Sequence, residues 1–166
     1  YFHQFIPDFE KSTFTIIPEE GLKRTSRRRE YLGINKTIHE KIRLAFRNVA
    51  SSTNVRSFVA CILQPKCFCS NSACIILPKK NGKIITSRDY FSMQAFLAGI
   101  VNSMVFDFLI RTRITMNLNF FYVYQTPVPL MINGKIAQQI IEAAVRLSSV
   151  DDRFKEFAST LDVRYR

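Results

Sequence analysis

The first regular pattern in this chain is an alternation of apolar and polar residues. It runs through Lys41–Ala50, and a period of two is typical of a strand with one core face and one basic face. A polar turn, Ser51–Asn54, separates it from a second apolar run, Val55–Gln64. We therefore predict an antiparallel pair of strands. The apolar face would carry Ile42, Leu44 and Phe46, and the basic face would carry Lys41, Arg43, Ala45 and Arg47.

A short apolar run and a long one follow. Ala73–Leu77 reads as a strand, and Asn81-Gly82 is a strong hairpin signal between it and Lys83–Thr86. Ser87 is then placed to cap a long helix, Arg88–Arg111. The apolar side of that helix would hold Phe91, Ala95, Leu97, Ala98, Val101, Val105, Phe108 and Leu109.

The last third of the chain changes from a strand pattern to a helical one. Phe120–Tyr124 is an aromatic run that predicts a core strand, with Phe120, Phe121 and Tyr122 inside. Gly134–Leu147 is amphipathic with helical spacing, and Ser149 or Asp151 would cap a final helix, Asp152–Ser159. The predicted fold is α+β: a mixed, mainly antiparallel sheet packed against a long helix, with a helical C-terminus. The inner side of the amphipathic helix would hold Ile136, Ile140, Ile141 and Val145.

Size and composition favour one domain with a real core. The chain has 166 residues, 47% of them hydrophobic and 15 of them Phe, which excludes a disordered protein. The longest mostly apolar window, Met93–Ile110, contains four polar residues and is short for a bilayer span, so we expect a buried helix and no membrane partner. Tyr1 opens in the middle of a pattern, and we expect a domain from a longer protein.

The charge of the chain points to a polyanionic partner. The formal net charge is +11, and Lys23–Arg56 alone holds ten Lys or Arg against two Glu. Such an excess favours nucleic acid first and an anionic membrane surface second, with mere solubility as the alternative. A basic run is placed to contact phosphates without reading bases. Its members are Lys23, Arg24, Arg27, Arg28 and Arg29.

Candidate chemistry within these residues is sparse. Cys61, Cys67, Cys69 and Cys74 lack the regular paired spacing of a zinc module, so buried reduced thiols are expected rather than a metal. The two histidines have no suggestive partners, and no Gly-rich phosphate loop is present. We therefore expect no catalysis, no metal and no cofactor in this chain by itself.

Three blocks carry a resemblance to a known family. They are Arg43–Ala50 continuing through Ser51–Arg56, then Asn102–Phe108, then Asn117–Phe121 running to Pro127-Val128-Pro129. In their order and spacing they resemble the C-terminal target-recognition region of Eco57I-type (type IIG) restriction–modification enzymes and related adenine-specific DNA methyltransferases. The helix containing Asn102-Ser103 also resembles one in specificity subunits of type I restriction systems.

The resemblance implies a function for the parent protein. This chain would be the target-recognition domain of a bacterial or archaeal phage-defence enzyme in the cytoplasm, with lead-in 1–40, recognition core 41–129 and C-terminal helices 130–166. It would bind double-stranded DNA beside the methyltransferase domain of the same chain, which lies outside these residues. That domain would flip out an adenine and methylate N6 with S-adenosylmethionine. An attached endonuclease, with Mg²⁺, is a further candidate in the parent.

The candidate base-reading residues follow from side-chain chemistry. Arginine can bond guanine O6 and N7, and asparagine can bond adenine N6 and N7. Each candidate has a structural alternative, because turns need internal donors and Asn often bonds its own turn. Two other functions also stay open: a protein-interaction module using helix Gly134–Leu147, and non-specific nucleic-acid binding. The DNA-binding candidates are Arg43, Arg47, Asn54, Arg56, Arg111, Arg113, Asn117 and Asn119.

Overall fold

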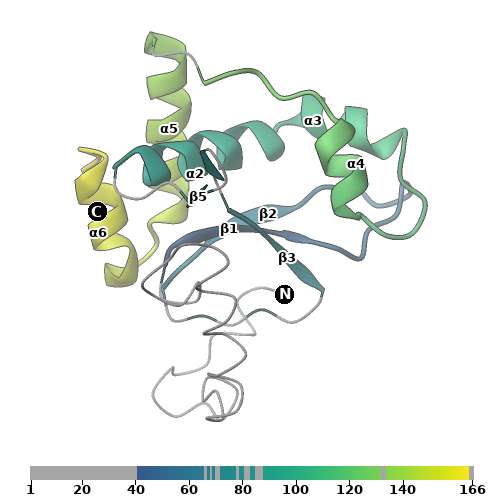
Figure 1. Cartoon of the computed structure of the whole chain (residues 1–166), viewed down its shortest axis with the longest axis horizontal. Coiled ribbons are helices and arrows are strands. Elements are labelled where there is room, and N and C mark those ends of the chain that lie inside the picture. The colour runs from purple at the N-terminus through teal and green to yellow at the C-terminus, as the bar shows by residue number, and fades with distance from the viewer. Residues whose placement is uncertain are drawn as a thin grey trace.

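The centre of the fold is a three-stranded antiparallel sheet (Figure 1). The computed structural model describes residues 41–65, 67, 69, 72–77, 79–80, 83–84, 88–131 and 134–164. Strand β1 (Arg43–Arg47) lies between β2 (Ala60–Leu63) and β3 (Ala73–Ile76). Leu44 lies opposite Ile62 on one side and Ile76 on the other. The predicted antiparallel pair is confirmed, and both of its strands are shorter than the pattern suggested.

The predicted basic face of β1 is wrong. Arg43 and Ala45 are as buried as Leu44 and Phe46, because β1 is the central strand and both of its faces are covered. Strict alternation predicts a half-exposed strand, whereas a central strand can be buried on both sides.

The Asn81-Gly82 hairpin signal identifies a smaller hairpin than expected. Strand β4 (Lys79–Lys80) pairs antiparallel with β5 (Lys83–Ile84), while β3 pairs with β1 instead. Asn81 and Gly82 themselves, and the predicted cap Ser87, lie outside the described residues.

The predicted helix Arg88–Arg111 is two helices. Helix α2 (Arg88–Val101) and helix α3 (Met104–Arg111) meet at a bend of 67°. Ser103 begins α3, because its Oγ accepts a hydrogen bond from the Phe106 N–H at 3.2 Å. None of the described helices is long and apolar enough alone to cross a bilayer, although α2 and α3 taken together pass that test.

The bend changes which side chains reach the core. Val105 and Phe108, which a straight helix would bury with the stripe of α2, are 70% and 66% exposed. In α2 the buried set includes Gln94 and Phe96, which the predicted stripe omitted. A bend rotates the apolar face of the second helix away from the first, so one continuous stripe cannot describe both.

The predicted strand Phe120–Tyr124 is a helix, α4 (Phe120–Gln125). None of its residues is fully buried, and Phe121 is 63% exposed. The Tyr122 N–H bonds the Asn119 carbonyl, and the Thr126 Oγ1 donates to the Tyr122 carbonyl. The predictions of a strand and of a fully buried aromatic triad are therefore both wrong.

Two C-terminal elements complete the α+β fold. Helix α5 (Lys135–Ser148) confirms the predicted amphipathic helix, and Asp151 caps the turn η4 (Asp152–Phe154), which leads into α6 (Lys155–Thr160). The buried residues of α5 are Ile141, Ala144 and Val145. Ile136, expected inside, is 74% exposed.

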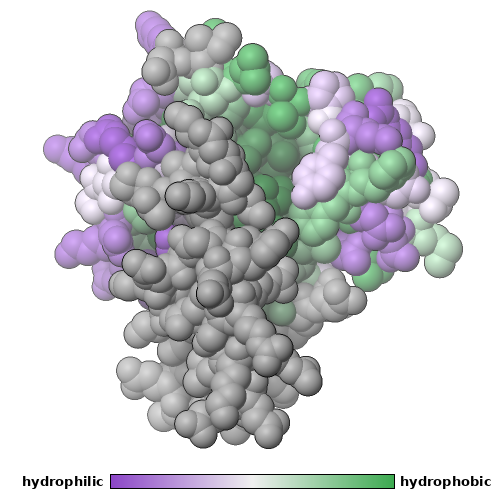
Figure 2. Space-filling model, viewed as in Figure 1, coloured by the Kyte–Doolittle hydropathy of each residue, from purple (hydrophilic) through white to green (hydrophobic). Residues whose placement is uncertain are grey.

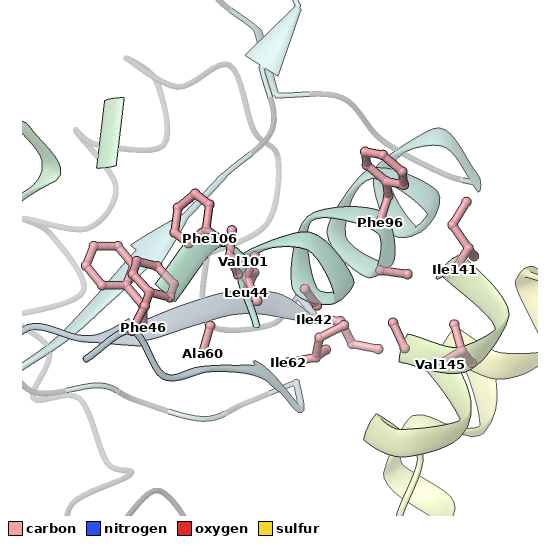
Figure 3. Packing of buried hydrophobic residues seen from close by; sticks show 14 of the residues in the cluster. Ile42, Leu44, Phe46, Ala60, Ile62, Phe96, Val101, Phe106, Ile141 and Val145 are labelled. Carbon is pink, nitrogen blue, oxygen red and sulfur yellow. The ribbon is translucent and has the colours of Figure 1, made fainter. Parts of the chain in front are cut away.

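Helix α2 packs on the sheet, and α5 packs across α2 and closes one end of the core. Figure 3 shows side chains from β1, β2, α2 and α5 contributing to one buried cluster. At the crossing of the helices, a Cβ added to Gly99 would lie 2.5 Å from Ile140 Cγ2. The close approach therefore depends on the missing side chain of glycine.

Two polar side chains of α2 complete the hydrogen bonding of the sheet. The Leu44 N–H donates to Gln94 Oε1 at 2.5 Å, and Gln94 Nε2 donates to the Ile76 carbonyl at 3.1 Å. The Tyr90 hydroxyl donates to the Ile42 carbonyl at 2.5 Å. Buried polar groups need such partners, so α2 is fixed to β1 by hydrogen bonds as well as by apolar contact.

The four cysteines carry thiols rather than disulfides in the described part of the chain. Cys67 is buried and the other three are partly exposed. Burial, reinforced by the nearby Cys69 and Cys67, raises the pKa of Cys61 to about 12. These thiols are therefore held protonated.

Candidate nucleic-acid interface

Asp107 is the centre of the polar junction between α3 and the loop that precedes β2. Its side chain is 6% exposed. Oδ1 accepts hydrogen bonds from the backbone N–H groups of Ser57 at 2.9 Å and Phe58 at 2.7 Å. Oδ2 accepts from Arg111 Nη2 at 2.9 Å, and Arg56 Nε lies 3.8 Å from Oδ1. One buried carboxylate thus fixes the loop to the helix.

Three predicted DNA-reading arginines build this junction. Arg47 donates to the Arg56 carbonyl at 2.9 Å, and Arg56 donates to the Asn102 carbonyl at 2.7 Å. Arg111 donates to the Val55 carbonyl at 2.6 Å as well as to Asp107. Arg47, Arg56 and Arg111 therefore bond groups of the protein itself, as the structural interpretation of these residues predicts.

The pKa of Asp107 reflects a balance between burial and its partners. Burial acts to raise the pKa, but the Phe58 N–H, the Arg111 hydrogen bond, the charge of Arg56 and the Ser57 N–H together outweigh it. The net result is a pKa below the usual range for this carboxyl group. Asp107 is therefore ionised wherever its partners are in place.

The three blocks identified in the sequence meet in space. The Asn102 side chain bonds both the N–H and the carbonyl of Ala60, at 3.1 and 3.0 Å, which joins the second block to β2. The Leu118 N–H donates to the Asn48 carbonyl at 2.7 Å, which joins the third block to the first.

A chain of aromatic rings underlies these hydrogen bonds. Phe46 contacts Phe58 and Phe120, each with ring centroids 5.2 Å apart, and Phe58 contacts Phe106 at 4.9 Å. The order Phe120, Phe46, Phe58, Phe106 therefore crosses all three blocks. Edge and stacked aromatic contacts of this kind add specific geometry to apolar burial.

Arg43 is removed from the DNA-binding candidates. It is 2% exposed and its Nη2 donates to the Cys67 carbonyl. Desolvation lowers its pKa even though Cys69, Cys67 and Tyr90 act in the opposite direction. A guanidinium enclosed in this way cannot reach a base edge, so the prediction from strand alternation is wrong at this position.

The remaining candidates lie at one end of the molecule, which we call the tip: loops 48–56 and 112–119 together with α4. Arg113, Asn117 and Asn119 are exposed there, and Asn54 is half-buried. The loops are adjacent, because Val49 and Asn117 form an isolated antiparallel bridge. Figure 1 places the tip at the right, away from α5 and α6, and Figure 2 shows polar and apolar side chains interspersed over it.

The amides at the tip are available for a ligand. Neither Asn117 nor Asn119 uses its side chain in a hydrogen bond to another described residue, and Asn119 begins α4 without a side-chain cap. Arg113 Nη1 donates to the Gln125 carbonyl at 2.6 Å, which leaves further guanidinium donors. Buried Leu118 separates the two exposed asparagines and anchors their loop.

Acidic side chains are missing from the tip surface. Residues 41–58 and 102–131 contain one carboxylate, Asp107, and it is buried between arginines. Arg56 and Arg113 lie in the tip, and Arg47 and Arg111 lie next to it, so the described tip and its surroundings have a positive balance. The predicted phosphate-contacting run, Lys23–Arg29, lies outside the described residues.

Sequence reasoning missed the two residues that organise the site. Asn102 and Asp107 were read only as polar interruptions of an apolar helix and as parts of a block. A single Asp within an apolar helical run was the available signal, because a buried carboxylate needs donors that other segments must supply. Within the described residues, no group of three His, Cys, Asp or Glu side chains is placed to hold a metal ion.

The geometry defines a class of molecule: an α+β domain whose tip is positive, carries exposed amides and is assembled from three separated blocks. Comparisons with models of protein families, with curated proteins and with solved structures find no match to this chain.

Proposed function

We propose that this chain is a duplex-DNA target-recognition domain that serves an adenine-specific N6 methyltransferase or restriction–modification enzyme. The catalytic domain, with its S-adenosylmethionine, would be another part of the parent protein. The tip would face the DNA, with Arg113, Asn117 and Asn119 as the candidates for base edges.

The observation that carries the proposal is the positive, acid-free tip with its exposed amides. Arginine and asparagine are the side chains that read guanine and adenine edges, and a surface without carboxylates does not repel phosphates. The contacts between the three blocks add support. The blocks on which the resemblance rests are far apart in the sequence, and in the structure they bond one another and together form the tip and its support. Arg47, Arg56 and Arg111 hold the tip in position, and their positive charges would attract DNA only from a distance.

The test is binding of the 166-residue chain to a pool of labelled duplex DNA at several salt concentrations. We expect the logarithm of the association constant to fall linearly with the logarithm of salt concentration, because bound phosphates release counterions. Selection and sequencing of the bound fraction would give the preferred sequence.

Two variants that each remove one positive charge distinguish DNA binding at the tip from general electrostatic attraction to the protein. Arg113→Ala should weaken duplex binding about tenfold, since a good arginine contact is worth about 1–3 kcal/mol. Arg164→Ala removes another exposed arginine, outside the tip, and should change affinity much less. Equal losses for the two variants, or duplex binding that does not respond to salt, would count against the proposal.

A further inference from the structure

A series of aromatic contacts begins in the core and ends on an exposed ring of α4. Phe46 meets Phe120 edge to face, and Phe120 stacks on Tyr124, with ring centroids 5.6 Å apart and planes 25° apart. Phe120 packs against the buried core, whereas Tyr124 is 81% exposed. Tyr124 therefore rests on another ring on one side and leaves most of its surface open.

The position of Tyr124 is fixed by the end of its helix. Thr126 is buried, its Oγ1 donates to the Tyr122 carbonyl at 2.8 Å, and its N–H donates to the Val123 carbonyl at 3.2 Å. A tyrosine side chain has few rotatable bonds, and contact with Phe120 restricts them further. A ligand that packs on this ring would therefore cost little conformational entropy.

The surroundings of the ring are positively charged. Arg113 Nη1 donates to the Gln125 carbonyl at 2.6 Å, which holds the guanidinium next to the residue that follows Tyr124. No Asp or Glu occurs in 112–126, the segment that supplies both side chains. An open aromatic face beside a cation, with no carboxylate in the same segment, suits a ligand that combines a flat ring with a negative charge. Nucleotides have that chemistry.

We propose that Tyr124 stacks on an unpaired nucleobase, so that the tip prefers DNA in which one base lies outside the helical stack. This inference rests on the proposed DNA-binding function and adds the state of the DNA that is bound. The base would extend the stack of Phe120 and Tyr124, and the charge of Arg113 would attract its phosphate. Because every base has a flat face, the contact would add affinity without reading sequence.

The experiment compares three end-labelled duplexes of one sequence that differ only at a central position. The first is fully paired, the second carries one bulged thymine, and the third carries a bulged abasic nucleotide, which keeps the backbone and removes the base. Their affinities for the 166-residue chain are measured by fluorescence anisotropy. We expect the bulged-thymine duplex to bind at least fivefold more tightly than either of the others, because it alone offers a base for stacking.

Substitutions at exposed rings provide the matched comparison, and the measured quantity is the ratio of affinities for the bulged-thymine and abasic duplexes. Tyr124→Ala should bring this ratio to within twofold of one, whereas Tyr124→Phe keeps the ring and should keep the ratio. Phe108→Ala removes a ring that is 66% exposed on α3, outside the tip, and should not change the ratio. Circular dichroism of the variants checks that the fold is kept.

Photo-cross-linking locates the stacked base directly. The bulged thymine is replaced by 5-iodouracil, which cross-links on irradiation to an aromatic ring stacked on it. Mass spectrometry should find the cross-link on Tyr124 in the native chain and on Phe at the same position in Tyr124→Phe. A cross-link confined to other residues would overturn the proposal.

The affinities separate failure of this inference from failure of the proposed function. Salt-dependent binding of the paired duplex, with equal affinities for the bulged-thymine and abasic duplexes, would overturn stacking by Tyr124 and leave the DNA-binding function in place. A preference that persists in Tyr124→Ala would also overturn it. Binding of the bulged-thymine duplex alone, lost in Tyr124→Ala, would keep the stacking site and contradict recognition of paired DNA. Binding of none of the three duplexes would overturn both.

Discussion

Asp107 shows how much structure one buried carboxylate can organise. It accepts bonds from two successive backbone N–H groups and from Arg111, while Arg56 stands nearby. Removing its charge would leave those donors facing an acceptor of half the capacity. Asp107 therefore stabilises the loop before β2 through contacts that no other described side chain makes.

Replacing Asp107 with Asn should lower the free energy of unfolding by about 3 kcal/mol, since buried donors lose a charged acceptor. Urea denaturation followed by circular dichroism measures the change. Asp89→Asn is the control, because Asp89 is exposed in the first turn of α2, and it should cost about 0.5 kcal/mol or less. Equal effects at the two positions would contradict the role given to Asp107.

The same carboxyl group should make stability depend on acid. Its pKa is lowered in the folded state, so its contribution is complete above the unfolded pKa of about 4 and is lost as the pH falls towards the folded value. Urea unfolding between pH 2 and pH 6 should therefore show a native chain that loses stability relative to Asp107→Asn as pH falls. Parallel curves for the two proteins would show that Asp107 is not the group responsible.

The thiol of Cys61 should be unreactive in the folded protein. With a pKa of about 12, roughly one molecule in ten thousand carries the thiolate at pH 8. We expect iodoacetamide to modify Cys61 at least 100-fold more slowly in buffer than in urea, as read by peptide mass spectrometry. Equal rates in the two solvents would mean that the thiol is not held protonated by its surroundings.

Among the elements, the crossing of α2 and α5 is the tightest described contact involving a glycine. Gly99 lies in the last turn of α2, and glycine within a helix normally costs up to about 1 kcal/mol relative to alanine. Its presence is explained by Ile140, whose Cγ2 occupies the place of a Cβ.

Gly99→Ala should therefore destabilise the protein by about 1 kcal/mol, because overpacking of about 1–3 kcal/mol exceeds the gain in helix propensity. In an Ile140→Ala background the same change should become neutral or stabilising. A double-mutant cycle by urea denaturation measures this coupling. Additive effects would show that the two side chains do not compete for one space.

The elements that were predicted well are those whose apolar residues recur with one clear helical or strand spacing. Helix α5 and the pairing of β1 with β2 follow directly from apolar spacing. The run Phe120–Gln125 does not, because aromatic residues favour strands only as a weak tendency, and here Phe120 packs on Phe46 as part of a helical turn. The bend at Asn102-Ser103 was also missed, although the Ser103 cap of α3 is a local signal. The bond from Asn102 to the Ala60 carbonyl, 42 residues away in the chain, could not be predicted from the pattern.

At the scale of the whole molecule, the tip is separate from the C-terminal helices. It comprises loops 48–56 and 112–119 with α4, and it lies away from α5 and α6 (Figure 1).

The candidate site was only partly predictable from the sequence. Asn54, Arg113, Asn117 and Asn119 lie together at the tip, but the sequence pattern could not distinguish side chains that bond the protein itself from those left exposed. Arg43 lies in the central strand and is enclosed by other segments, whereas Arg113 lies in the turn after α3 and stays exposed. That information lies in the packing of distant elements, which apolar periodicity does not encode.

The loop before β2 is held chiefly through its backbone: Asp107 takes the N–H groups of Ser57 and Phe58, and Arg111 and Arg47 take the carbonyls of Val55 and Arg56. A backbone group is the same whatever side chain it carries. Substitutions at Ser52, Asn54 and Val55 can therefore accumulate during evolution without loss of the loop's shape. If the tip binds DNA as proposed, changes at these exposed positions could alter the target sequence while the backbone contacts keep the loop in place.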